Sequence, residues 1–124
     1  MVDTSALMAI VLGEADADRC IDALESAENL LISAGTVAEA LIVAARRDVE
    51  DEVASLIDHL GFTIVPVSAG TARQVAQAYG QWGKGVHAAG LNFGDCFAYA
   101  LAKDNDCPLL FVGQDFAKTD LQPA

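Results

Sequence analysis

The chain has 124 residues, of which 53% are hydrophobic and 20% charged, and its formal net charge at pH 7 is −11. This length and apolar content exclude a disordered chain and predict a single packed domain over residues 1–124. The acidic balance excludes a broad basic face for nucleic acid. We therefore expect a basic protein or cation as partner, or an acidic site neutralised by metal ions while a few basic groups hold the substrate.

No apolar run approaches the roughly 18 residues that span a membrane, so no membrane association is expected. The longest run, Ala6–Leu12, indicates a buried core or interface helix instead. No basic segment precedes it, so no secretory signal is expected. The three cysteines, Cys20, Cys96 and Cys107, form no CxxC motif and cannot pair completely, which favours reduced thiols in a cytoplasmic protein.

Short apolar strands alternate with helical segments along the chain. The expected strands are residues 1–3, 30–32, 63–65 and 109–112. The expected helices are residues 5–12, 14–27, 36–47 with Thr36 as the N-cap, 49–60, 68–82 with Ser68 as the N-cap, and 95–103. This alternation predicts an α/β fold in which a central, mostly parallel sheet lies between two helical layers. Ligands bind such sheets beyond the carboxyl ends of the strands.

Four carboxylates stand near these predicted strand ends and helix starts: Asp3, Glu39, Asp95 and Asp115. Carboxylates brought together at one sheet edge repel one another unless they are protonated or bridged by a cation. Oxygen ligands select hard cations such as Mg²⁺ or Mn²⁺, which polarise a phosphodiester and activate water. The shared placement of the four acids therefore indicates a catalytic metal site.

Each carboxylate also has a local explanation that stays open. Asp3 can cap the helix that follows it, and Glu39 completes a capping box with Thr36. Asp95 at a helix start suits the helix dipole, and Asp115 suits an ordinary turn. Any one of the acids taken alone is weak evidence, and their shared placement supports a metal site without deciding between it and the local explanations.

Several segments in order along the chain form a wider pattern. They are Val2-Asp3-Thr4-Ser5-Ala6-Leu7, Ala38-Glu39-Ala40, Tyr79-Gly80 through Lys84-Gly85 followed by His87, the stretch from Gly90 to Ala102, and Leu109 to Phe116 with Thr119-Asp120. Together these segments resemble the VapC-type toxins of the PIN-domain family. The resemblance spans the whole chain, and the stretch from Gly90 to Ala102 is its most specific part.

This resemblance implies a PIN-like α/β/α domain and an Mg²⁺- or Mn²⁺-dependent endoribonuclease, the toxin of a type II toxin–antitoxin pair. Asp3, Glu39 and Asp95 then carry over as catalytic metal ligands, and Asp115 as the fourth acid. Ser5 is implied to hydrogen-bond within or just outside the ligand set, with helix capping as its alternative role.

The sequence departs from the family pattern at one position. Many relatives carry a second acid where Gln114 stands, which puts the fourth ligand in doubt and leaves Asp120 as a weaker substitute. Gln114 therefore keeps an alternative open, in which a catalytically weakened PIN fold only sequesters RNA or a protein partner. A phosphoryl-accepting receiver domain is disfavoured, because Asp3 stands alone and Lys118 lies beyond a turn.

The resemblance also implies protein partners. A VapB-like antitoxin normally wraps such a toxin and often places a basic side chain in the acidic site, which would account for the charge of −11. We also expect a homodimer, because Ala6–Leu12 and the helix from Val49 carry more apolar surface than one small sheet can cover.

The glycine-containing loop at residues 83–94 carries Lys84 and His87 toward Asp95. Both are candidate contacts to RNA phosphates, with mere solvation as the alternative. The loop is not a P-loop, because it lacks the four-residue spacer and follows a helix instead of a strand. Tyr79 and Trp82 have the chemistry to stack on bases, although packing is the favoured role for both.

Overall fold

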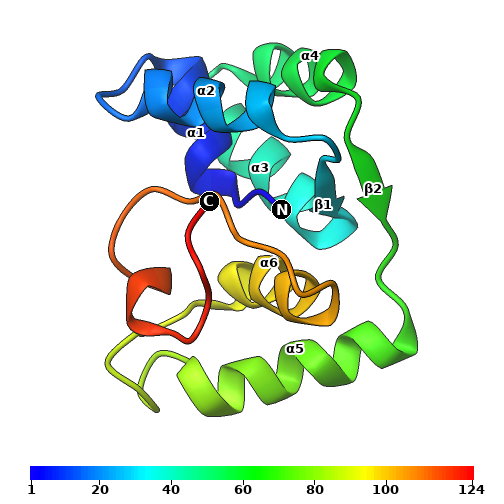
Figure 1. Cartoon of the computed structure of the whole chain (residues 1–124), viewed down its shortest axis with the longest axis vertical. Coiled ribbons are helices and arrows are strands. Elements are labelled where there is room, and N and C mark those ends of the chain that lie inside the picture. The colour runs from blue at the N-terminus through cyan, green and yellow to red at the C-terminus, as the bar shows by residue number, and fades with distance from the viewer.

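The computed structural model describes all 124 residues, and its elements follow the predicted alternation of strands and helices (Figure 1). The strands are β1 (Leu31–Ser33) and β2 (Thr63–Val65). The helices are α1 (Thr4–Leu12), α2 (Ala17–Ser26), α3 (Ala34–Arg46), α4 (Glu50–Leu60), α5 (Ala69–Trp82), α6 (Phe93–Asp104) and the short 3₁₀ helix η1 (Phe116–Lys118).

The central sheet is parallel but short. β1 and β2 pair in parallel, with Ile32 opposite Ile64. The predicted strands at residues 1–3 and 109–112 meet only through an isolated parallel bridge between Val2 and Leu110. The chain enters α1 immediately after Asp3, which leaves no room for a longer first strand. The expectation of a mostly parallel sheet is confirmed, with two of its members reduced to single bridges.

Two hydrophobic clusters cover opposite faces of this sheet. Because successive side chains of an extended segment point to opposite faces, Leu110 joins the cluster built on α1 to α4, whereas Leu109 and Phe111 join the cluster built on α5 and α6. Figure 1 shows the same division, with α1 to α4 on one side of the central segments and α5 and α6 on the other. The predicted three-layer α/β/α arrangement is confirmed.

Three predicted helix starts are wrong. α2 begins at Ala17, three residues later than predicted. α3 begins at Ala34, because Ser33 at the end of β1 already caps it by accepting a hydrogen bond from the Gly35 N–H at 3.1 Å. Thr36 is instead fully buried inside the first turn, so the expected capping box between Thr36 and Glu39 does not form. α6 begins at Phe93, two residues earlier than predicted.

The expected excess of apolar surface on α1 and α4 is also wrong. Residues 6–9 of α1 are buried, because α2, α3 and α4 all pack against this helix. Val53 and Ile57 of α4 are buried as well. The exposed large hydrophobic residues lie elsewhere: Ile42, Ile64, Val67, Tyr79, Val86 and Phe93.

The cysteines are free, as predicted, and Cys20 and Cys96 are buried. None of the helices combines the length and the apolar character that crossing a membrane requires.

Candidate functional site

The four predicted carboxylates occupy the ends or inner turns of different elements. Asp3 is the N-cap of α1, Glu39 lies within α3, Asp95 lies in the first turn of α6, and Asp115 precedes η1. Asp3 and Asp95 are buried, Glu39 is half-buried and Asp115 is exposed. The charges of the other three carboxylates all raise the pKa of Asp95, so the fold brings the four within electrostatic reach of one another.

Asp3 is held by Ser5. One carboxylate oxygen of Asp3, Oδ2, accepts hydrogen bonds from the Ser5 N–H at 3.1 Å and the Ser5 hydroxyl at 2.7 Å. The Ser5 hydroxyl in turn accepts a hydrogen bond from the Val112 N–H at 3.0 Å, which ties α1 to the C-terminal segment. The other oxygen of Asp3, Oδ1, is buried and has no partner. Asp3 therefore caps α1 with one oxygen and leaves the second free for a ligand.

Glu39 is positioned by two residues that the sequence did not single out. The Thr4 hydroxyl donates a hydrogen bond to Glu39 Oε1 at 2.6 Å. The Glu39 carboxylate lies directly against Gly94, where any side-chain carbon would overlap it. The position of Thr4 next to Asp3, and of Gly94 next to Asp95, is the only sequence signal for these roles.

Asp95 forms a capping box with Asn92. The Asn92 side chain accepts a hydrogen bond from the Asp95 N–H at 2.8 Å, and Asp95 Oδ2 accepts one from the Asn92 N–H at 3.0 Å. The Asn-x-x-Asp spacing was a readable capping signal, and it explains why α6 starts earlier than predicted. Asp95 thus has a capping role in addition to its place among the carboxylates.

Burial and mutual repulsion hold protons on this cluster. Burial raises the pKa of Asp95 to about 7, although the hydrogen bond from Asn92 opposes this, and the charges of Asp3, Glu39 and Asp115 raise it further. Burial also raises the pKa of Asp3 to about 6, against the lowering effect of its hydrogen bonds from Ser5. Near neutral pH the site therefore retains protons that a cation would displace.

These pKa values predict that the metal-free protein is more stable in mild acid than in mild base. Between about pH 4 and 7 the folded chain holds protons on Asp3 and Asp95 that the unfolded chain has released, so the free energy of unfolding falls as the pH rises. Thermal melts in EDTA should give a higher Tm near pH 5.5 than near pH 8. The difference should shrink in Asp95→Asn, and a higher Tm near pH 8 in the wild type would contradict the assignment.

The residues fit a hard divalent cation in chemistry, although no group of three or more His, Cys, Asp or Glu side chains is already arranged to hold one. One oxygen of Glu39 is bound by the Thr4 hydroxyl and one oxygen of Asp95 by the Asn92 N–H. The unpartnered Oδ1 of Asp3 and the all-oxygen donor set match the needs of Mg²⁺ or Mn²⁺.

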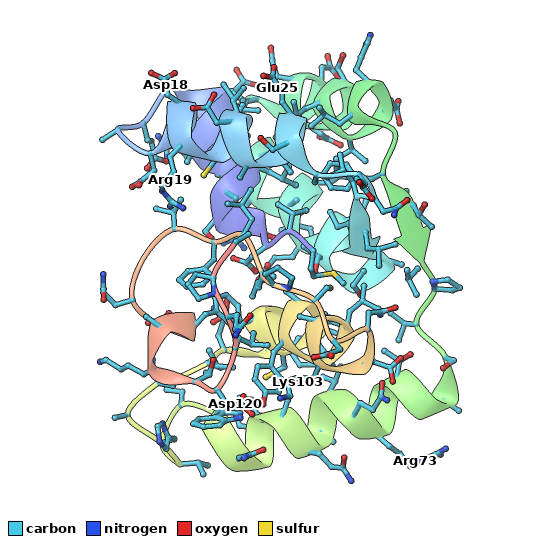
Figure 2. All side chains as sticks on the ribbon, in the orientation of Figure 1. Asp18, Arg19, Glu25, Arg73, Lys103 and Asp120 are labelled. Carbon is cyan, nitrogen blue, oxygen red and sulfur yellow. The ribbon has the colours of Figure 1, made fainter.

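Asp120 does not belong to this cluster. Its carboxylate accepts hydrogen bonds from the Tyr99 hydroxyl at 2.7 Å and from Lys103 Nζ at 3.0 Å, and Figure 2 shows Lys103 and Asp120 close together beside α6. Trp82 donates to the same Tyr99 hydroxyl at 2.8 Å, so Trp82 packs inside the protein as favoured. The structure thus removes Asp120 as a substitute for the fourth acid and leaves exposed Asp115.

The two side chains predicted to contact RNA are exposed to solvent. Lys84 and His87 are exposed in the loop between α5 and α6, and His87 packs edge-on against Trp82 with ring centroids 4.7 Å apart. Arg19, which the sequence did not mark, donates a hydrogen bond to the Phe111 carbonyl at 3.1 Å, and Figure 2 shows it beneath α2. Arg19 also forms an ion pair with Asp16 at 3.1 Å, so its charge is partly neutralised at the start of its own helix.

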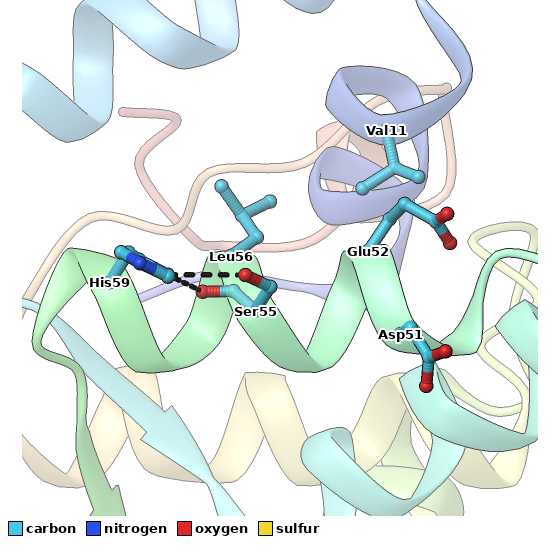
Figure 3. Close-up of a pocket in the computed structure, with 6 residues that line it drawn as sticks. All are labelled: Val11, Asp51, Glu52, Ser55, Leu56 and His59. Carbon is cyan, nitrogen blue, oxygen red and sulfur yellow. Dashed lines mark hydrogen bonds between the residues drawn. The ribbon is translucent and has the colours of Figure 1, made fainter.

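Two hollows differ in their relation to the carboxylates. A hollow of about 540 Å³ lies between α1 and α4 and is lined by Val11, Asp51, Glu52, Ser55, Leu56 and His59 (Figure 3). None of the four predicted acids lines it, and the ring of His59 hydrogen-bonds to Ser55 on its own helix, as a structural residue does. A second hollow of about 300 Å³ includes Glu39 in its wall and so adjoins the carboxylate site.

Comparisons with known proteins agree with this fold and site. The family model described as PIN domain matches residues 1–121. Ribonuclease VapC42 of Mycobacterium tuberculosis is 44% identical over 129 aligned residues, covering 100% of this chain and 98% of the relative. Ribonuclease VapC28 of the same organism is 41% identical over 128 aligned residues, covering 100% and 96%.

Two solved structures share the fold. VapC20 of Mycobacterium tuberculosis, described as a toxin that cleaves the sarcin-ricin loop, has a TM-score of 0.80 at 17% identity and covers 99% of this chain and 96% of its own. A chain of a toxin–antitoxin complex from Klebsiella pneumoniae has a TM-score of 0.70 at 21% identity, covering 96% and 91%. With an acidic α/β/α site in place and relatives above 40% identity along the full chain, this protein belongs to the PIN-domain family and, within it, to the VapC ribonucleases.

Proposed function

We propose that this chain is an Mg²⁺- or Mn²⁺-dependent endoribonuclease and the toxin of a type II toxin–antitoxin pair. The observation that carries the proposal is the buried Oδ1 of Asp3, which has no hydrogen-bond partner. The negative charges of Asp3, Glu39 and Asp95 also repel one another, and a cation bound between them would relieve this repulsion. Asp3, Glu39 and Asp95 would hold the cation, and Asp115 at the exposed rim would be the fourth acid.

In this proposal each residue has a defined task. When bound, the cation would polarise the phosphodiester and lower the pKa of water. Ser5 fixes the Asp3 carboxylate from α1, and Thr4 fixes Glu39 from the same turn. The Asn92 N–H holds one oxygen of Asp95, so the first turns of two helices orient the acids before substrate arrives.

Cleavage of a labelled RNA by the purified chain, with Mg²⁺ or Mn²⁺ and then with EDTA, tests the function. We expect cleavage only in the presence of metal. RNA binding without cleavage under every metal condition would instead favour the alternative, a PIN fold that only sequesters its partner.

We further propose a VapB-like antitoxin as partner and a cytoplasmic location. The net charge of −11 favours a partner whose basic segment covers the acidic site. The structural neighbour from Klebsiella pneumoniae is a chain of a toxin–antitoxin complex. Three free cysteines suit a reducing compartment.

A homodimer also remains a proposal, now with a different surface. Exposed Ile64 and Val67, on and just after β2, supply apolar area that α1 and α4 do not. Sedimentation velocity at micromolar concentration without antitoxin should show a dimer. A monomer throughout this range would contradict the proposal.

Lys84→Ala should weaken RNA binding and flatten its salt dependence. Lys84 is exposed beside the start of α6, and loss of one phosphate contact on single-stranded RNA should lower the slope of log K against log salt by about 0.7. Fluorescence anisotropy with labelled RNA over a salt series measures this. If affinity and slope both stay at the wild-type values, Lys84 does not contact phosphate.

A further inference from the structure

Phe93 is a large aromatic residue that folding leaves in water. Its side chain is 69% exposed, more than any other exposed large hydrophobic residue of the chain. It is the first residue of α6, between the N-cap Asn92 and Gly94. A helix start does not require an aromatic residue, and an exposed ring gives up the stabilisation that burial provides. The position of Phe93 therefore points to a contact outside the chain.

The ring of Phe93 forms one side of a built hollow. It packs edge to face with Phe97, with centroids 5.0 Å apart and an interplanar angle of 89°. The ring of Phe97 lies so close to Gly35 that a side-chain carbon there would overlap it. The hollow measures about 300 Å³ and is lined by Gly35, Ala38, Glu39, Ile42, Phe93, Gly94 and Phe97, called here the Phe93 pocket.

The Phe93 pocket and the predicted carboxylate site have one residue in common, Glu39. Glu39 lines the pocket and also contributes to the raised pKa of Asp3 and Asp95. Glu39 is the single charged residue in the lining, and the rest of the wall is aromatic, aliphatic or glycine. A group seated in the pocket would lie beside the acids.

We propose that the Phe93 pocket receives a base of the RNA substrate, stacked on Phe93 next to the phosphate that is cleaved. The proposal rests on the proposed ribonuclease function and adds a substrate subsite to it. A base presents a flat face to an aromatic ring and can leave its polar edge in water. A peptide segment would instead bring backbone N–H and C=O groups, for which the lining offers only the Glu39 carboxylate among its side chains.

The charge of the protein supports a base as the occupant. The formal net charge is −11 and only seven residues are Lys or Arg, so few phosphate contacts are available to hold RNA against an acidic site. Stacking does not depend on neutralising phosphate, and every base has a face that can stack. Stacking of a base on an exposed aromatic ring beside the carboxylates would contribute RNA affinity that the few Lys and Arg residues do not provide.

The test compares Phe93→Leu, which keeps an apolar side chain, with Phe93→Tyr, which keeps the aromatic ring. Anisotropy with a fluorescein-labelled, mixed-sequence single-stranded RNA in EDTA and low salt measures binding without cleavage. We expect Phe93→Leu to bind about tenfold more weakly and Phe93→Tyr to bind within about twofold of wild type. The salt slope of Phe93→Leu should equal that of wild type, because no phosphate contact is lost. Val11→Ala, which shortens a half-buried apolar side chain in the hollow between α1 and α4, is the matched control and should bind as wild type does.

Equal RNA affinity of wild type and Phe93→Leu, or no RNA binding by wild type, would overturn the proposal. The proposal would also be overturned if Phe93→Leu bound the antitoxin more weakly but bound RNA as wild type does, because the pocket would then be a site for the antitoxin. Cleavage with Mn²⁺ is measured separately. If the wild-type protein binds RNA through Phe93 but never cleaves it, the proposed function is refuted and the pocket proposal stands. If the wild type cleaves RNA and Phe93→Leu binds RNA as tightly as the wild type does, the pocket proposal alone is refuted.

Discussion

Asp95→Asn is expected to lower RNA cleavage by more than about a hundredfold, while the metal-free protein melts at the same or a higher temperature. Burial raises the pKa of Asp95 to about 7, and the charges of three other carboxylates add to this rise. Asparagine keeps an oxygen to accept the hydrogen bond from the Asn92 N–H, so the capping box survives. It removes one negative charge from the repelling cluster, which favours the folded state above pH 7.

Adding metal should make the wild type melt at a higher temperature than Asp95→Asn. The wild type should gain about 2.7 kcal/mol at a metal concentration one hundred times its Kd, and Asp95→Asn should gain much less. Thermal melts across an Mn²⁺ or Mg²⁺ titration, beside a cleavage assay, measure both effects. If Asp95 were only a helix cap, neither protein would respond to metal and cleavage would be unchanged. An active variant with a wild-type metal response would remove Asp95 from the site and undermine the whole cluster.

Gly94→Ala is expected to lower cleavage by about ten- to a hundredfold with little loss of stability. A methyl group at this position overlaps the Glu39 carboxylate, which is the flexible end of its side chain and can swing aside. The fold is then spared, but Glu39 leaves the Thr4 hydroxyl and its place near Asp95. Cleavage rates with Mn²⁺ and the metal-induced rise in Tm should both fall.

Gly80→Ala is the matched control for this substitution. Gly80 lies inside α5, and a side-chain carbon there meets no atom within 4 Å. Alanine favours a helix interior over glycine by up to about 1 kcal/mol, so Tm should hold or rise and cleavage should stay at the wild-type rate. Wild-type cleavage by Gly94→Ala as well would show that the position of Glu39 beside α6 is not needed.

The sequence by itself determined the features that depend on near neighbours along the chain. β2 falls on the predicted residues 63–65, and Ser68 caps α5 as expected, because apolar spacing and capping side chains act over a few residues. Thr36 shows the limit of such patterns. A Thr-x-x-Glu spacing has the form of a capping box, but Ser33 ends a strand three residues earlier and takes the cap.

The apolar content of α1 shows the same limit at the level of packing. Its sequence predicted surplus surface, and only the approach of α2, α3 and α4 decided that most of it is buried. The surface left exposed lies instead on residues such as Ile64 and Phe93, whose exposure no local pattern revealed.

Only the tertiary structure decided how the acids are held. The Ser5 hydroxyl meets the Val112 N–H across 107 residues, and the Thr4 hydroxyl meets Glu39 across 35. Gly94 is required because α3 and α6 approach closely enough for the Glu39 carboxylate to rest on its backbone. Such contacts depend on the distance between packed helices, which is set by the whole core and not by the residues adjacent to each acid. The sequence therefore identified the candidate carboxylates, and the packing of α1, α3 and α6 brought them within electrostatic reach of one another.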